Sequence, residues 1–135
     1  MSDSRAWKSI QLSAQHAPAA GAFSPAAEAG NLIFVSGQVP RDPVTGQWEK
    51  GRPLAEQVHR VFSNLALTLA AAGTGLVDVA SVTIYLADIS AWGTVNEIFQ
   101  EYFRPPFPAR AVVGVALEGF LIEVSAVAAR PTQQQ

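Results

Sequence analysis

The chain has 135 residues, a formal net charge of -2 and 49% hydrophobic residues, a composition typical of one globular domain with a single core. It has no cysteine, which excludes disulfides and thiolate chemistry, and His16 and His59 lie too far apart in sequence for a typical metal motif. The basic residues are scattered and no apolar run approaches 18 residues, so we expect a soluble, cytoplasmic protein that binds neither nucleic acid nor membranes.

The composition also bears on domain organisation and assembly. We expect a single domain over residues 1–135, with residues 1–5 and 131–135 as frayed tails. Charged residues make up only 15% of the chain, which is few for a domain of this size. Because apolar surface left on a small domain is often covered by another subunit, this is a mild indication of a homo-oligomer.

The first half of the chain is predicted to contain two strands and a long helix. Residues 6–12 could form a short strand, residues 16–30 read as an irregular loop, and residues 31–37 form a strand whose apolar residues occupy both faces. Residues 41–47 contain Asp-Pro and Gly and predict a turn. A helix is expected to begin at Pro53 and to stop at Gly73, because apolar residues recur between them at helical spacing.

The second half predicts a strand, a helix and two further strands. Val82, Ile84 and Leu86 alternate with polar residues, which indicates a strand with one buried face. A second helix is expected near Ser90, a good N-cap, with an apolar stripe of Trp92, Val95, Ile98, Phe99, Tyr102 and Phe103. Three prolines interrupt residues 103–110, and two strands then follow, predicted to pair as a hairpin across Glu118 and Gly119.

This order of elements predicts an α+β fold. Hairpins mixed with crossover connections imply a mixed sheet with both helices packed on one face. The other face of the sheet would then need a cover, which strengthens the indication of an oligomer.

Arg110 is the first candidate functional residue. It follows the rigid segment Pro-Pro-Phe-Pro and opens an apolar strand, where its guanidinium could be held still. A guanidinium grips a carboxylate with two hydrogen bonds. The alternative is an arginine at a strand end that extends to water.

Glu123 is the second candidate, because it interrupts the most apolar strand of the chain. A carboxylate there faces solvent, pairs with a cation, or has a raised pKa and works as an acid or base. A two-residue loop at Glu118 and Gly119 would place Arg110 opposite Val127. Glu123 would then lie on the same face as Arg110, about 13 Å away at ~3.3 Å per residue, with room for a small ligand between them.

Three further positions could line a pocket. Ser36-Gly37-Gln38 interrupts a strand, and a bulge there would aim Ser36 or the Gly37 N–H at a ligand, although a purely structural kink explains it equally well. Asn96 lies off the apolar stripe of its helix, where a solvated position is the default. Phe23 lies in an irregular loop, where core filling is the simplest role.

Taken together, five segments resemble the RidA (YjgF) family of enamine/imine deaminases. They include the stretches "AGNLIFVSGQVPRDPVTG", "PAR" and "IEVSAVA", and the matching residues are 29–46, 70–89, 95–103, 108–110 and 122–128. The resemblance implies a chorismate-mutase-like α+β fold in a homotrimer, with the three sheets forming a central barrel, and active sites between subunits. It implies cofactor-independent hydrolysis of 2-imino or 2-enamino acids to 2-keto acids and ammonia, with no metal.

By the same resemblance, Arg110 would clamp the substrate carboxylate and Glu123 would orient or activate the attacking water. Ser36, Gly37 and Asn96 would line the pocket. Two positions depart from the family pattern: Phe23 stands where the deaminating branch usually has tyrosine, and Val112 where it often has cysteine. These departures leave two alternatives open, a non-catalytic trimer that binds or senses 2-keto acids and a pathway-specific aminomuconate-type deaminase.

Overall fold

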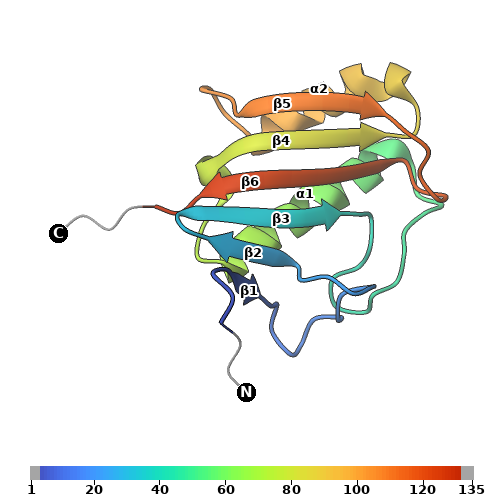
Figure 1. Ribbon diagram of the computed structural model, residues 1–135. Coiled ribbons are helices and arrows are strands. Elements are labelled where there is room, and N and C mark those ends of the chain that lie inside the picture. The colour runs from blue at the N-terminus through green and yellow to red at the C-terminus, as the bar shows by residue number, and fades with distance from the viewer. Residues whose placement is uncertain (1–3, 132–135) are drawn as a thin grey trace.

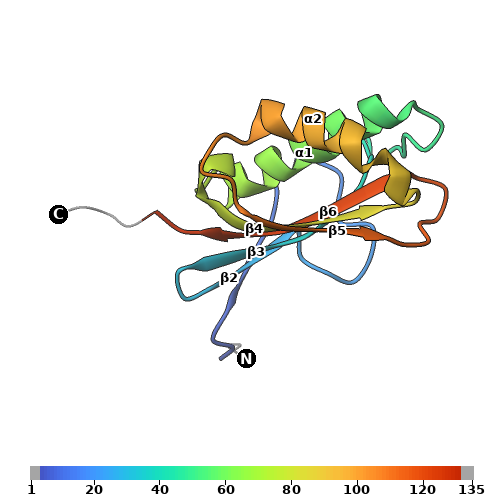
Figure 2. The same ribbon diagram turned by 90° about the horizontal axis from the view of Figure 1, so that it is seen from above.

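The computed structural model describes residues 4–131 and shows an α+β fold with one six-stranded sheet and two helices (Figure 1). The strands are β1 (Lys8–Ile10), β2 (Ala26–Ala29), β3 (Leu32–Gln38), β4 (Val79–Leu86), β5 (Ala109–Gly114) and β6 (Ile122–Ala129). The helices are α1 (Leu54–Ala71) and α2 (Trp92–Tyr102), and both cover the same face of the sheet, as predicted (Figure 2). Most of the two predicted tails, residues 1–3 and 132–135, lies outside the described residues.

The strand order is β1-β2-β3-β6-β4-β5, and only β4 and β5 pair in parallel. The predicted hairpin between the last two strands is therefore wrong, because β4 lies between them. Residues 115–121 instead carry the chain across the end of β4: the Val115 N–H donates to the Leu86 carbonyl oxygen, and the Ala87 N–H donates to that of Leu121. Gly119 does lie in a turn, as its sequence predicts, and has a φ of 85°, but this turn is part of the wide connection between β5 and β6.

The core lies between the sheet and the two helices. On β4 the apolar residues at alternate positions are fully or almost fully buried, as their spacing predicts, and so are those of β3 that point toward α1. Phe62 of α1 packs edge-on against Phe99 and Phe103 at the α2 end of this core. Trp92, expected in the apolar stripe of α2, is 52% exposed because α2 only begins there, after a 3-10 turn whose N-cap is Asp88 and not Ser90.

The ends of α1 follow from its sequence. Pro53 lies just before the first helical residue, Ala72 is the C-cap of the helix, and Gly73 follows in the left-handed region at a φ of 80°. Arg130 donates to the Ala72 carbonyl oxygen and forms an ion pair with Glu28 of β2, tying this helix end to the sheet. Strand β2 lies inside the stretch predicted as loop, and its pairing with β3 over four residues overrides an alanine-rich local sequence.

The face of the sheet opposite the helices is uncovered in the single chain. Leu32, Phe34 and Val113 are 41%, 44% and 41% exposed on it. These apolar side chains lie on β3 and β5, where the alternation of the strands directs them away from the helices. Within residues 4–131, no helix is both long enough and apolar enough to cross a membrane.

Candidate functional site

Arg110 lies at the start of the edge strand β5 and is held by α2. Its Nη1 donates to Asn96 Oδ1 at 2.8 Å, and its guanidinium carbon lies 4.8 Å from the centre of the Phe99 ring. Asn96 and Phe99 are three residues apart and share a face of the helix, so one element supplies both contacts. A hydrogen bond and a stacked ring together orient the guanidinium and leave its other N–H groups available for an anion.

The guanidinium lies at the rim of a hollow of about 380 Å³ whose lining includes Asn96, Phe99, Phe107, Pro108 and Arg110, which we call the Arg110 cluster. The alternative of an arginine that only extends to water does not describe this side chain, because Asn96 and Phe99 contact its guanidinium, although Arg110 is exposed in the single chain. Asn96, for which a solvated position was the default, is half-buried and accepts the hydrogen bond from Arg110. The sequence reasoning did not identify Phe99 and Phe107 as site residues. The i, i+3 spacing of Asn96 and Phe99, which places both on one helix face, was the signal that could have identified Phe99.

Strand β3 contains the bulge that Ser36-Gly37-Gln38 predicts. Val35 pairs with Ala126 and Gln38 with Val124, so the two residues between Val35 and Gln38 face a single residue of β6. The Ser36 hydroxyl donates to the carbonyl oxygen of Ser24 at 2.6 Å, and the Gln38 amide donates to that of Ser36 at 3.0 Å. These bonds brace the bulge and hold the loop before β2 against it.

Gly37 brings the bulge against Glu123. A Cβ atom at Gly37 would lie 2.1 Å from Glu123 Oε2, so only glycine allows the strand and the carboxylate to approach this closely. Ser36, Gly37 and Glu123 are called the Glu123 cluster below. Gly37 therefore marks a place where the backbone of β3 closely approaches another group, as a glycine within a strand indicates. That group is the side-chain carboxylate of Glu123.

The Glu123 carboxylate is half-buried and makes no hydrogen bond or ion pair with the described residues. Its removal from water raises its pKa above the usual 4.5. In the single chain, Glu123 therefore has no cation partner among the described residues, and burial raises the pKa of its carboxyl. A carboxylate in such a setting is a better proton acceptor than one in water, which suits it to general base chemistry.

The two clusters do not meet within one chain. Arg110 pairs with Val82 of β4 and Glu123 with Tyr85, three residues further along the same strand. An odd separation directs the two side chains to opposite faces, with Arg110 toward the helices, so the prediction that they share a face is wrong. The error came from the hairpin that does not form. The residues lie about 10 Å apart across the sheet and about 10 Å along it.

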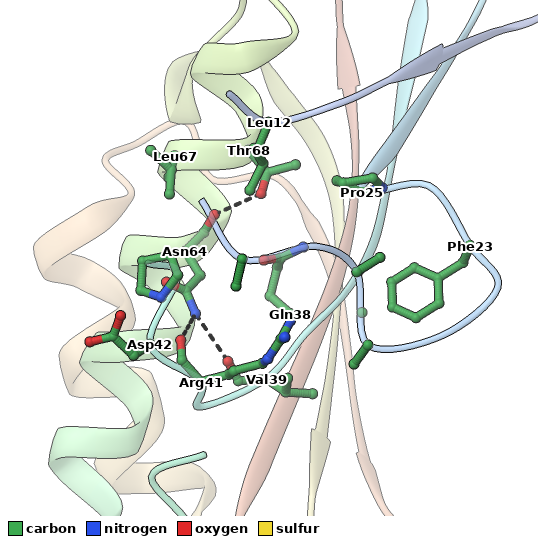
Figure 3. Close-up of a pocket in the computed structure, with 15 residues that line it drawn as sticks. Leu12, Phe23, Pro25, Gln38, Val39, Arg41, Asp42, Asn64, Leu67 and Thr68 are labelled. Carbon is green, nitrogen blue, oxygen red and sulfur yellow. Dashed lines mark hydrogen bonds between the residues drawn. The ribbon is translucent and has the colours of Figure 1, made fainter. Parts of the chain in front are cut away.

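The two departures from the family pattern lie on different elements, Val112 on β5 and Phe23 in the loop before β2. Val112 follows Arg110 on the same face of β5, is half-buried, and packs against the core. Phe23 is 52% exposed and therefore does not fill the core, which was its simplest predicted role. Its ring borders a pocket that Gly37 also lines (Figure 3).

Comparison with known proteins assigns this arrangement of sheet and helices to a class. The family model described as endoribonuclease L-PSP matches residues 14–130. A RutC family protein of Pyrococcus abyssi is 44% identical over 110 residues, covering 80% of this chain and 86% of the relative. The 2-iminobutanoate/2-iminopropanoate deaminases of Rattus norvegicus and Homo sapiens are 43% and 41% identical over 120 residues, with 87% of each chain covered.

Solved structures of similar fold support the same class. A putative endoribonuclease of Thermotoga maritima has a TM-score of 0.84 at 35% identity, covering 93% of this chain and 99% of that one. RidA of an Antarctic Psychrobacter has a TM-score of 0.82 at 31% identity, covering 90% and 99%. The fold is thus that of L-PSP and RidA proteins. The chain belongs to the endoribonuclease L-PSP family, the RidA (YjgF) family that its motifs resemble.

Proposed function

We propose that this protein hydrolyses 2-imino acids, and the enamino acids in equilibrium with them, to 2-keto acids and ammonia. The observation that carries the proposal is the oriented guanidinium of Arg110, held by Asn96 and Phe99 with donors to spare. Planar guanidinium matches the carboxylate that every 2-imino acid carries. Relatives at about 40% identity named as 2-iminobutanoate/2-iminopropanoate deaminases support the same reaction class.

Besides a group that binds the carboxylate, the reaction requires a base that removes a proton from the attacking water, and Glu123 supplies this base. The substrate reacts as the iminium, with its nitrogen protonated. As the water oxygen bonds to the C=N carbon, the π electron pair moves to nitrogen and Glu123 accepts one water proton, which leaves a neutral carbinolamine. The protonated Glu123 then returns that proton to the amine nitrogen, the C–N bond breaks with its electron pair leaving on ammonia, and Glu123 accepts the hydroxyl proton as the C=O bond forms and passes it to the departing ammonia. Because imines hydrolyse spontaneously, positioning and general base catalysis of the order of 10²–10⁴-fold are sufficient.

The proposal includes a homotrimer with sites shared between subunits. Within one chain the sheet itself separates Arg110 from Glu123. A site that uses both groups must therefore take the Arg110 cluster from one subunit and the Glu123 cluster from its neighbour. The exposed apolar side chains of Leu32, Phe34 and Val113 favour such an assembly, because burying them between sheets would remove them from water.

The test is a coupled assay in which an amino-acid oxidase generates imines and semicarbazide traps those that remain. Added protein should lower semicarbazone formation. Arg110→Lys keeps the charge but not the planar fork, and we expect it to lower kcat/KM by about tenfold or more, mainly through KM. Arg104→Lys, on an exposed loop outside the clusters, is the matched control and should be unaffected.

If the protein never hastens imine loss for any amino acid tested, the deaminase proposal is wrong. Calorimetry with 2-keto acids then separates the remaining possibilities, because tight binding without turnover would indicate a binding or sensing trimer. The family description as an endoribonuclease makes RNA cleavage a third outcome, against which the net charge of -2 argues.

A further inference from the structure

Tyr85 lies beside Glu123 on the uncovered face of the sheet. It belongs to β4, and in the antiparallel pairing of β4 with β6 it is directly opposite Glu123. Residues directly opposite each other in such a pair have Cβ atoms about 5 Å apart on the same face, within reach of an aromatic side chain. Strand β6 lies between β4 and β3, and Gly37 of β3 approaches the Glu123 carboxylate from the other side (Figure 1). The carboxylate therefore has the bulge on one side and a tyrosine on the other.

The hydroxyl of Tyr85 is available to a ligand. The residue is half-buried, and within residues 4–131 its hydroxyl has no hydrogen-bond partner, yet its oxygen is not sealed in the interior. The hydroxyl of Ser36 already donates its proton to a backbone carbonyl oxygen. Thr83 and Ser125 carry the next hydroxyls on this face, each two residues, about 7 Å, further along its strand. In the described part of the chain, Tyr85 is therefore the hydroxyl beside Glu123 whose proton is not engaged.

The proposed reaction needs a hydrogen-bond donor at this place. The oxygen of the attacking water becomes the carbonyl oxygen of the 2-keto acid, and a carbonyl oxygen only accepts hydrogen bonds. The ionised carboxylate of Glu123 also only accepts, so it can take a proton from this oxygen but cannot hold the oxygen once the proton has gone. A phenol O–H can donate to the same oxygen from the attack of water until the product leaves.

We propose that Tyr85 is a third catalytic residue, whose hydroxyl donates a hydrogen bond to the oxygen that attacks the C=N carbon. The inference rests on the proposed function and adds a residue to the Glu123 side of that site. As the C=O bond forms, negative charge develops on this oxygen, and the phenol stabilises the charge without giving up its proton. The alternative role for the ring is to fill space beside Val113, which pairs with Tyr85 from β5 and is 41% exposed.

Tyr85→Phe keeps the ring and removes only the hydroxyl, so it separates the two roles. In the coupled imine assay we expect kcat to fall by about tenfold or more and KM to stay within about twofold, because the carboxylate clamp of Arg110 is untouched. Tyr102→Phe is the matched control. Tyr102 is the only other tyrosine of the chain, and its hydroxyl forms a hydrogen bond with His59 between the two helices. This control should leave both kcat and KM unchanged.

An unchanged kcat in Tyr85→Phe, beside an active wild type, would overturn the inference and leave the deaminase proposal standing. A fall in kcat would also overturn it if native mass spectrometry showed that the variant had lost the wild-type assembly, since the ring would then act at an interface. If the wild type hydrolyses no imine, the proposed function fails, and calorimetry with pyruvate tests the hydrogen bond to the carbonyl oxygen. Tyr85→Phe should then weaken pyruvate binding by about threefold or more. Equal affinities, or no binding by the wild type, would overturn the inference.

Discussion

At the residue scale, the candidate site depends on one cation fixed by two contacts and on one carboxylate that has no partner among residues 4–131. Asn96 and Phe99 fix the Arg110 guanidinium before any substrate arrives, which reduces the entropy lost on binding. Glu123 keeps its negative charge half-buried with no compensating contact among residues 4–131. Such a group lowers the stability of the chain, and this is typical of a functional site.

The raised pKa of Glu123 predicts how activity depends on pH. Only the ionised carboxylate accepts a proton from water, so kcat/KM should rise with pH through a midpoint above 4.5, the usual pKa of glutamate. Glu123→Gln cannot accept the proton, and we expect it to lower kcat by about 10²–10⁴-fold and to abolish the acidic limb of the profile. A variant that kept the wild-type profile would show that another group is the base.

At the element scale, the bulge of β3 and the segment after it are positioned by α1. Arg60 of α1 donates from Nε and Nη2 to the two carboxylate oxygens of Glu49, at 2.9 and 3.0 Å. This two-point contact and the Asn64 amide hold residues 39–52 against the helix. The wall of the pocket near Gly37 is thereby fixed from the helix side of the molecule.

Glu49→Gln should therefore destabilise the fold in a pH-dependent way. The hydrogen bonds from Arg60 hold the pKa of Glu49 below 4.5, so its stabilisation is present above pH 4.5 and lost as the pH falls through the lowered pKa. In thermal unfolding near pH 7 we expect a loss of about 1 kcal/mol, vanishing in acid. Glu56→Gln breaks an exposed pair with Arg52 and should cost less; an equal loss in both variants would contradict this role for Glu49.

Much of the secondary structure could be predicted from the local sequence. Alternation located β4, helical spacing located α1, and Gly37 marked the bulge, because each signal depends on near neighbours in the chain. The strand order could not be predicted, since pairing of β5 with β4 is decided by distant residues. Because the predicted strand order was wrong, the prediction that Arg110 and Glu123 lie on the same face of the sheet was wrong as well. Within the site, the residue types indicated the chemistry, but the contact of Gly37 with Glu123 required the register of β3 on β6.

At the scale of the whole molecule, the fold separates the two halves of the proposed chemistry. The Arg110 cluster lies at the β5 edge on the helix side, and the Glu123 cluster lies two strands away on the opposite face. Assembly would then be a condition of catalysis as well as of stability. A chain that folds but does not associate would bind its substrate with only one of the two groups.

Mixing two inactive variants, Arg110→Ala and Glu123→Gln, tests this shared site most directly. Subunits unfolded together and refolded at equal amounts should form a population of trimers, about three quarters of them mixed, in which about one quarter of all sites combine an intact Arg110 with an intact Glu123 from different chains. Deaminase activity should therefore recover to about a quarter of the wild-type value, while each variant refolded alone stays inactive. If native mass spectrometry confirms mixed trimers and the mixture remains as inactive as its components, the two residues do not act together across a subunit boundary.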